Sequence, residues 1–244
     1  MTAAVTEAVD RATAVNTALA TVLDPELDRP ITELGFVRSV SVGADGSVEA
    51  TLRLPTYFCA PNFAWLMVED ARRALAALPW AGECRVILED HFASEEINEG
   101  VGCGKGFAEA FPGLADPDRM EELRAVFVRK GHLAAQARLG KRLLERGWTM
   151  LQLADAVLGD VPERLTVTLR RRRTLLGLPS GPAAPLFADD QGRPVPAAAL
   201  ERHLRRGRTA GVGIGANTEV CEGLLAVRYG PSEESEESEE EGSG

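Results

Sequence analysis

The stretch Ser47-Val-Glu-Ala-Thr-Leu-Arg-Leu-Pro-Thr-Tyr-Phe-Cys-Ala-Pro61 decides how the first third of this 244-residue chain folds. Apolar and polar side chains alternate over much of its first half, which predicts a β-strand that ends near Leu54. Proline favours the first turn of a helix, so a helix is expected to begin near Pro61. Cys59 then lies just before a helix N-terminus, where unpaired amides and the helix dipole lower the pKa of a thiol. We therefore expect a thiolate there, the form that binds iron or attacks sulfur.

The segments around this stretch complete a small domain. Residues 36–42 alternate in the same way and are joined to it by a Gly-Ala-Asp-Gly turn, which predicts a β-hairpin. Apolar residues spaced by three and four predict helices over residues 4–23 and from residue 61 to about 78. Residues 84–88 read as a third strand. The order α-β-β-α-β predicts a two-layer α/β domain of the α+β type.

The chain divides into four parts by composition and pattern. The predicted domain covers residues 1–92, and a glycine-containing linker is expected over residues 93–118. Residues 119–230 read as mostly helical, with a strand near residues 224–229 before their end. Residues 231–244 consist almost entirely of Ser, Glu and Gly, which predicts a disordered acidic tail.

The charge of the chain is distributed unevenly. The net charge is −10, but residues 1–118 hold 8 basic and 19 acidic side chains, whereas residues 119–208 hold 18 basic and 9 acidic ones. The remaining residues are strongly acidic. Such asymmetry indicates at least two units with different surfaces.

Hydropathy and the first residues indicate the compartment. Apolar runs are all shorter than the roughly 18 residues that a membrane span needs, and the first ten residues lack the pattern of a secretory signal. We therefore expect a cytoplasmic protein with no membrane contact, whose four cysteines are free thiols.

In its first part the chain resembles the metal–sulfur (iron–sulfur) cluster assembly domain family, which includes the phenylacetate-degradation D protein and cytosolic iron–sulfur targeting factors. The resemblance covers about residues 8–90. Its elements occur in the family's order: Asp24-Pro-Glu26, Pro30-Ile31, Leu34-Gly-Phe-Val37, the hairpin, the Cys59 loop, the helix and Cys84–Leu88.

The resemblance implies a role that is not enzymatic. A protein of this family acts as an assembly or maturation factor, holds iron or an iron–sulfur cluster transiently, and delivers it to a client metalloenzyme. Some members serve oxygenase pathways, so a metal-dependent oxygenase is a reasonable client, and residues 119–230 are expected to select it. Cys59 is the implied metal ligand. Thr56 lies beside the position of the family's threonine, which is Pro55 here, and joins the candidate site.

Two carboxylates also belong to the family's motif. Asp24 and Glu26 could be ligands or acid–base groups, but the pattern favours a helix-ending turn in which Asp24 makes a local backbone hydrogen bond.

Further metal ligands have to come from elsewhere, because iron–sulfur centres generally use four. Cys103, in the glycine-rich stretch Gly100–Gly106, is the second predicted metal ligand, although that stretch also reads as a mobile linker. A homodimer or the client's own thiols are the other sources. Cys84 and Cys221 read as core or neutral positions.

The acidic stretch after the third strand offers one more pattern. His91 and Glu95 have the spacing of a helical iron-binding pair, but a solvated acidic segment is the favoured interpretation.

The basic middle segment supports an alternative, a metal-sensing regulator that binds nucleic acid. Residues 143–157 resemble the first half of a helix-turn-helix, and the runs Arg170–Arg173 and Arg202–Arg208 could contact phosphates. No clear recognition helix follows, and the acidic flanking segments would repel nucleic acid. Nucleic-acid binding is therefore the disfavoured alternative.

Overall fold

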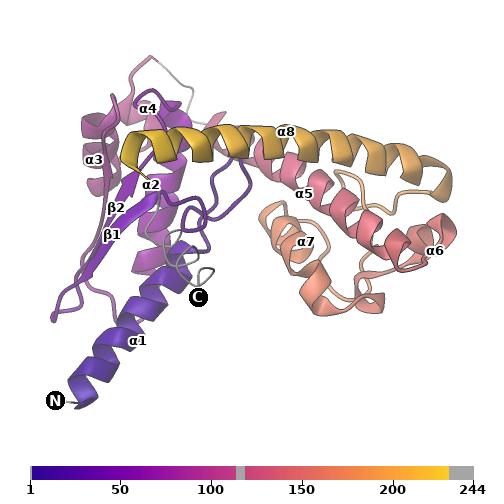
Figure 1. Cartoon of the computed structure of the whole chain (residues 1–244), viewed down its shortest axis with the longest axis horizontal. Helices are drawn as coiled ribbons and strands as arrows, with labels where there is room; N and C mark the ends of the chain where they lie inside the picture. The colour runs from indigo at the N-terminus through magenta and orange to yellow at the C-terminus, as the bar shows by residue number, and fades with distance from the viewer. Residues whose placement is uncertain (1, 114–118, 231–244) are drawn as a thin grey trace, which may run out of the picture. The chain divides into compact units, whose positions relative to one another are not determined.

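A computed structural model describes residues 2–113 and 119–230, which form two compact units (Figure 1). The first unit contains residues 2–113, 119–120 and 217–230, and the second contains residues 121–216. The predicted class, an α-β-β-α-β domain followed by a helical region, is confirmed. The predicted acidic tail lies outside the described residues.

A three-stranded sheet is the framework of the first unit. Its strands are β1 (Val37–Val42), β2 (Val48–Arg53) and β3 (Cys84–Glu89), in the order β1-β2-β3. β1 and β2 form the predicted antiparallel hairpin, whereas β3 runs parallel to β2. Parallel neighbours need a crossover connection. The loop that holds Cys59 and the following helix provide this crossover.

Helices complete the core of this unit. They include α1 (Thr2–Leu19) and α2 (Pro61–Ala76), which pack on each other and on the sheet. α1 ends four residues earlier than expected, because Leu23 leaves the helix to form a β-bridge with Pro30. The fully buried apolar side chains of this core include Leu19, Ile31, Phe36, Leu52, Leu54, Met67, Leu75 and Leu88.

The segment expected to be a linker contributes to the same core. Within it lie α3 (Ser94–Gly102) and the short α4 (Phe107–Ala110), and both bury apolar side chains against the sheet domain. At Gly100 a Cβ atom would lie 2.7 Å from the Trp65 ring. That glycine is therefore needed for close packing rather than for flexibility. The spacing of Ile97 and Val101 was the signal of a helix.

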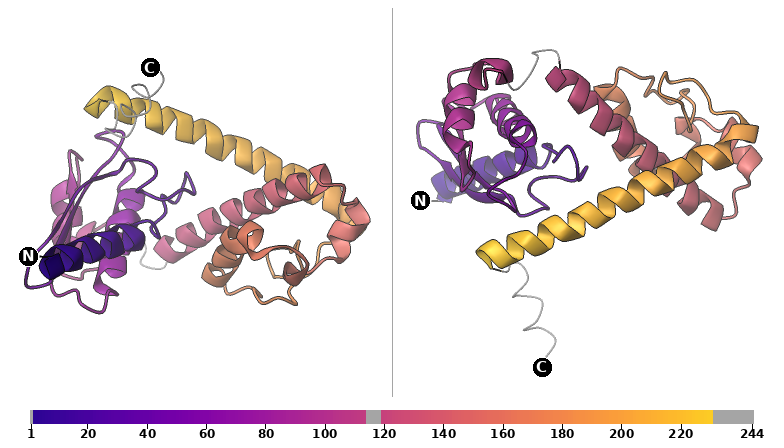
Figure 2. Two further views of the ribbon diagram at one scale, coloured as in Figure 1. Left: turned by 60° about the horizontal axis from the view of Figure 1, so that its bottom comes forward. Right: turned by 90° about the horizontal axis from the view of Figure 1, so that it is seen from above.

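The last element, α8 (Ala197–Tyr229), is one unbroken helix of 33 residues, as both views of Figure 2 show. The prediction of a strand near residues 224–229 is wrong. Cys221, Leu225 and Tyr229 follow each other at helical spacing and all pack against the core of the first unit. β-branched and aromatic residues favoured a strand locally, but tertiary packing decides the outcome.

The second unit is helical, as predicted. It contains α5 (Arg119–Glu145) from residue 121 on, α6 (Met150–Asp155), the 3-10 turn η1 (Leu158–Asp160), α7 (Glu163–Leu175) and the first half of α8. Its core includes Leu143, Leu153, Leu158, Leu169, Leu186, Phe187, Leu200 and Leu204. No helix among the described residues is long and apolar enough to cross a membrane.

Arginines of the run in α7 make hydrogen bonds inside their own unit. Arg173 is fully buried and donates to the backbone oxygens of Pro185 and Leu186 at 2.7 and 3.0 Å. Arg172 is also buried, and Arg170 donates to the Ser180 oxygen at 2.7 Å. Arg172 and Arg173 are therefore not available to phosphates, contrary to the expectation for the run Arg170–Arg173, because they are buried and bond to backbone oxygens of their own unit.

Candidate functional site

Cys59 lies in the loop between β2 and α2, one residue before Ala60, the N-cap of α2. Pro61 is at the start of the helix, as its sequence position predicted. The thiol is half-buried and packs against the core of the first unit. The sequence thus gives the position of this cysteine correctly.

The pKa of the Cys59 thiol is raised, whereas the sequence predicted that it would be lowered. Burial, together with the nearby Asp24 carboxylate and Cys221 thiol, raises the pKa of its thiol to about 12. The amide of Ala60 acts in the other direction, but it is outweighed. The start of α2 offers few free donors, because Pro61 has no N–H and the Phe63 amide is already hydrogen-bonded. In the empty protein this thiol is protonated at neutral pH.

The Asp24 turn forms one side of the Cys59 neighbourhood. Asp24 is 5% exposed, and its Oδ1 accepts the backbone N–H groups of Glu26 and Leu27, each at 2.8 Å. The predicted local hydrogen bond is thus confirmed. Burial raises the pKa of this carboxyl to about 6 in spite of the two donors. Asp28 closes the turn with φ of 55°, a left-handed conformation that Asp tolerates better than most residues.

His91 anchors the Cys59 loop by a hydrogen bond to its backbone. It is 2% exposed, its Nδ1 accepts the Ala93 amide at 3.2 Å, and its Nε2 donates to the Cys59 carbonyl at 2.7 Å. Burial lowers the pKa of this imidazole, which keeps it neutral. The solvated segment expected here is correct for Glu95 but wrong for His91. The sequence signal that could have indicated the role of His91 was its position two residues after β3, because functional side chains are often found in loops at strand ends.

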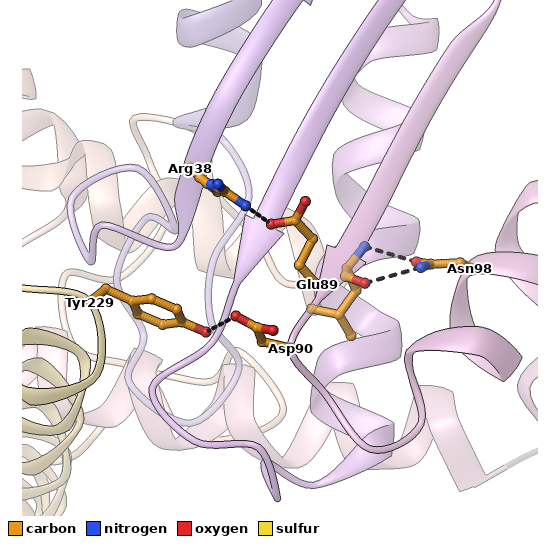
Figure 3. A network of polar contacts seen from close by, with 6 residues as sticks. Arg38, Glu89, Asp90, Asn98 and Tyr229 are labelled. Carbon is orange, nitrogen blue, oxygen red and sulfur yellow. Dashed lines mark hydrogen bonds and ion pairs between the residues drawn. The ribbon is translucent and has the colours of Figure 1, made fainter.

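Two polar contacts hold β3, which leads into the segment that carries His91 (Figure 3). The side-chain amide of Asn98 accepts from the Leu88 N–H at 2.8 Å and donates to the Leu88 carbonyl at 3.0 Å. Arg38 of β1 forms an ion pair with Glu89 across the end of the sheet. The end of β3 is therefore fixed on both sides.

The last turns of α8 cover the same end of the sheet. Arg228 donates to the Leu54 carbonyl at 3.1 Å and to the Asp90 carbonyl at 2.6 Å, so one guanidinium joins the loops that follow β2 and β3. The Tyr229 hydroxyl donates to the Asp90 carboxylate at 3.2 Å (Figure 3). Asp90 has φ of 50°, the second non-glycine residue in the left-handed region. These contacts fix α8 over the Cys59 loop.

An exposed aromatic cluster, formed by Tyr57, Phe58 and Phe92, flanks Cys59. Their exposed fractions are 47%, 77% and 47%, and the three ring centroids lie between 5.1 and 6.4 Å apart. Large apolar side chains that gather on a surface mark a contact site more often than scattered ones do. The Phe92 amide donates to the Tyr57 carbonyl at 3.1 Å, which ties the two loops of the cluster together.

The remaining predicted ligands lie in two places. Thr56 and Glu26 are half-buried in the two loops beside Cys59. Cys103 is exposed at the end of α3, where it lines a cavity together with Cys84 but not with Cys59. Within residues 2–113 and 119–230, no three His, Cys, Asp or Glu side chains are placed to hold a metal ion.

Lys105, two residues after Cys103, forms an ion pair with Glu99 at 2.7 Å.

Comparison with known proteins matches residues 12–87 to the family described as iron–sulfur cluster assembly protein. Proteins named iron–sulfur cluster carrier protein from Mycobacterium tuberculosis and Mycobacterium bovis are 38% identical over 119 residues, which is 48% of this chain and 30% of theirs. The chain thus matches less than a third of the length of these curated relatives. An uncharacterized protein from Methanocaldococcus jannaschii is 32% identical over 82 residues, 34% of this chain and 84% of that one. No solved structure matches.

Proposed function

The chain belongs to the iron–sulfur cluster assembly protein family, and on that premise we propose that it is a non-catalytic carrier. It takes up iron or an iron–sulfur cluster transiently and passes it to a client metalloenzyme. The observation that carries the proposal is Cys59, a half-buried thiol inside the matched segment, beside an exposed aromatic cluster. Thiolate sulfur is the usual protein ligand of iron–sulfur clusters.

The cargo site is built around Cys59. Asp24, Glu26 and Thr56 lie in the two loops beside it and are the proposed oxygen-bearing neighbours. The thiol is protonated in the empty protein, so loading has to displace that proton, and a half-buried thiol releases its cargo more easily than a preformed thiolate would. Cys103 remains a second proposed ligand for cargo shared with another copy of the chain, because it is exposed.

The client is proposed to contact the aromatic cluster. Such a surface buries apolar area on docking and brings a partner next to the cargo thiol. Residues 119–230 were predicted to select the client, and we propose this role for the part of them that forms the second unit, residues 121–216. A metal-dependent oxygenase is the proposed client class, by analogy with the family.

The alternative of a nucleic-acid-binding regulator has weaker support from the first of its two arginine runs. Arg172 and Arg173 are buried in contacts inside their own unit, whereas the arginines of the run Arg202–Arg208 are exposed and could still contact phosphates.

Anaerobic reconstitution tests the proposal. The full chain is incubated with ferrous iron and sulfide, desalted, and analysed for bound iron and visible absorption. Cys59→Ser should lose the bound iron and the absorption, whereas Cys84→Ser, which changes another half-buried thiol at the start of β3, should retain both. Equal loading of Cys59→Ser and the unaltered chain would overturn the proposal.

Transfer is the second half of the test. The loaded chain is mixed with an apo-ferredoxin and, separately, with the apo form of a metal-dependent oxygenase. Phe58→Ser should load normally but transfer more slowly, because Phe58 is the most exposed ring of the aromatic cluster. If Phe58→Ser transfers its cargo as fast as the unaltered chain does, the aromatic cluster is excluded as the docking surface.

A further inference from the structure

We propose that Cys221, carried on α8, supplies the second thiol of the cargo site that Cys59 begins. This inference rests on the proposed function and adds a ligand from outside the segment that matches the family, since residues 12–87 do not include α8. No local pattern could join these two cysteines, because they lie 162 positions apart in the chain.

Contacts on both sides of Cys221 fix its position. One helical turn before it, Asn217 donates to the Glu26 carboxylate at 3.0 Å. The next residue, Glu222, forms a 2.5 Å ion pair with Arg29. Residues four apart share a helix face, so Cys221 lies on the face that meets the Asp24 turn.

The contact continues along the same helix. One turn after Cys221, Leu225 is buried in the core of the first unit and touches the backbone at Gly35, where a Cβ atom would lie 3.3 Å from its side chain. Arg228 then joins the chain just after β2, at Leu54, only five residues before Cys59. The helix therefore crosses from the Asp24 turn to the Cys59 loop with Cys221 between these contacts.

The two thiols have the same surroundings. Both are half-buried, both pack against the same core, and the charge of Asp24 acts on both. The other two cysteines differ from them, because Cys84 and Cys103 line a separate cavity beside α3. Of the four thiols, Cys59 and Cys221 are the two that the fold brings to one place.

Two thiols beside a buried carboxylate suit a soft or borderline metal. Thiolates select iron–sulfur clusters, zinc and copper(I) over magnesium or calcium. A pair of thiols leaves two positions of a four-ligand iron open, and these are positions that a client's own cysteines can take during transfer. The second thiol thus adds binding strength without closing the site.

The experiment combines substitution with thiol protection on the full chain. Cys59→Ser, Cys221→Ser and the control Cys84→Ser are reconstituted anaerobically with ferrous iron and sulfide, and bound iron is measured. The unaltered chain is also treated with iodoacetamide, empty and loaded, and the four cysteines are followed by peptide mass spectrometry. The protection experiment needs no variant, so it holds even if Cys221→Ser folds poorly.

We expect Cys221→Ser to bind at least tenfold less iron than the unaltered chain, and Cys84→Ser to bind as much iron as the unaltered chain. Loading should protect Cys59 and Cys221 together and leave Cys84 labelled as before. Normal loading of Cys221→Ser, with Cys221 labelled equally in the empty and loaded chains, would overturn the inference while Cys59→Ser still fails. If Cys59→Ser loads normally, the proposed function itself fails, so the two results are distinguishable.

Discussion

Cys59 and Cys103 both lie at the end of a helix, yet the fold gives their thiols different surroundings. Cys59 precedes α2, is half-buried, and lies near Asp24 and beneath α8. Cys103 follows α3, is exposed, and its amide donates to the Glu99 carbonyl at 2.9 Å. At Cys59, burial and neighbouring charge control the pKa of the thiol more strongly than the start of the helix does.

The largest difference is expected in reactivity. A pKa near 12 in place of the ordinary 9 reduces the thiolate fraction of Cys59 about a thousandfold at neutral pH. With the empty chain at pH 7.5, iodoacetamide should therefore label Cys103 at least a hundredfold faster than Cys59, as timed peptide mapping would measure. Equal rates would mean that Cys59 is a reactive thiolate after all.

The second effect concerns Asp24 and pH. Its folded pKa of about 6 exceeds the ordinary 3.8, so the folded chain binds a proton that the unfolded chain releases. The free energy of unfolding should therefore fall as pH rises from about 4 to 6, by up to about 3 kcal/mol. Asp24→Asn keeps an oxygen acceptor for both amides and should lack this fall in urea titrations at several pH values.

A matched control separates this carboxylate from the others. Asp45→Asn changes an exposed aspartate in the hairpin turn and should retain the slope of the unaltered chain. If the free energy of unfolding of Asp24→Asn falls with pH just as that of the unaltered chain does, the Asp24 carboxyl is not protonated in the folded state at pH 5.

The third effect tests how the Cys59 loop is held. His91→Ala removes two hydrogen bonds from a buried site and should lower the free energy of unfolding by about 2 kcal/mol at pH 8. It should also speed the labelling of Cys59, because the loop loses its anchor. Glu95→Ala, at an exposed position of α3, should change neither value.

The stability that His91→Ala loses should depend on pH in a defined direction. The folded pKa of His91 lies below its ordinary 6.5, so the unfolded chain takes up a proton first as pH falls. The stabilisation is complete above about pH 6.5 and is lost as pH falls below that value. The gap between the unaltered chain and His91→Ala should therefore narrow at pH 5, and a widening gap would contradict a neutral imidazole.

The smallest effect is expected on the Cys103 side. Lys105 forms an ion pair with Glu99, and both side chains are exposed, so Lys105→Ala should leave the melting temperature unchanged within error. A drop of several degrees would show that the turn at Cys103 is held more firmly than its contacts indicate.

The sequence predicted the local part of this fold well. Alternation gave the hairpin, Pro61 gave the start of α2, and the spacing of residues 24–26 gave the Asp24 turn. These features depend on neighbours within a few residues of each other. The position of Cys59 follows from them.

The rest depended on contacts between residues far apart. The raised pKa of Cys59 comes from burial and from Asp24, 35 residues away, and no local pattern contains that information. His91 was hidden because its partner is a backbone carbonyl 32 residues earlier. Cys221 could be joined to the site only after the course of α8 was known.

The course of α8 has a consequence for how the protein is made. The Cys59 loop leaves the ribosome together with its strands, whereas residues 217–229 follow only after all of residues 121–216 have been translated. At about 5–20 residues per second, translation of those residues alone takes roughly 5 to 20 seconds. Each newly made chain therefore passes through an interval in which the loop has emerged but the helix that covers it has not yet been synthesised.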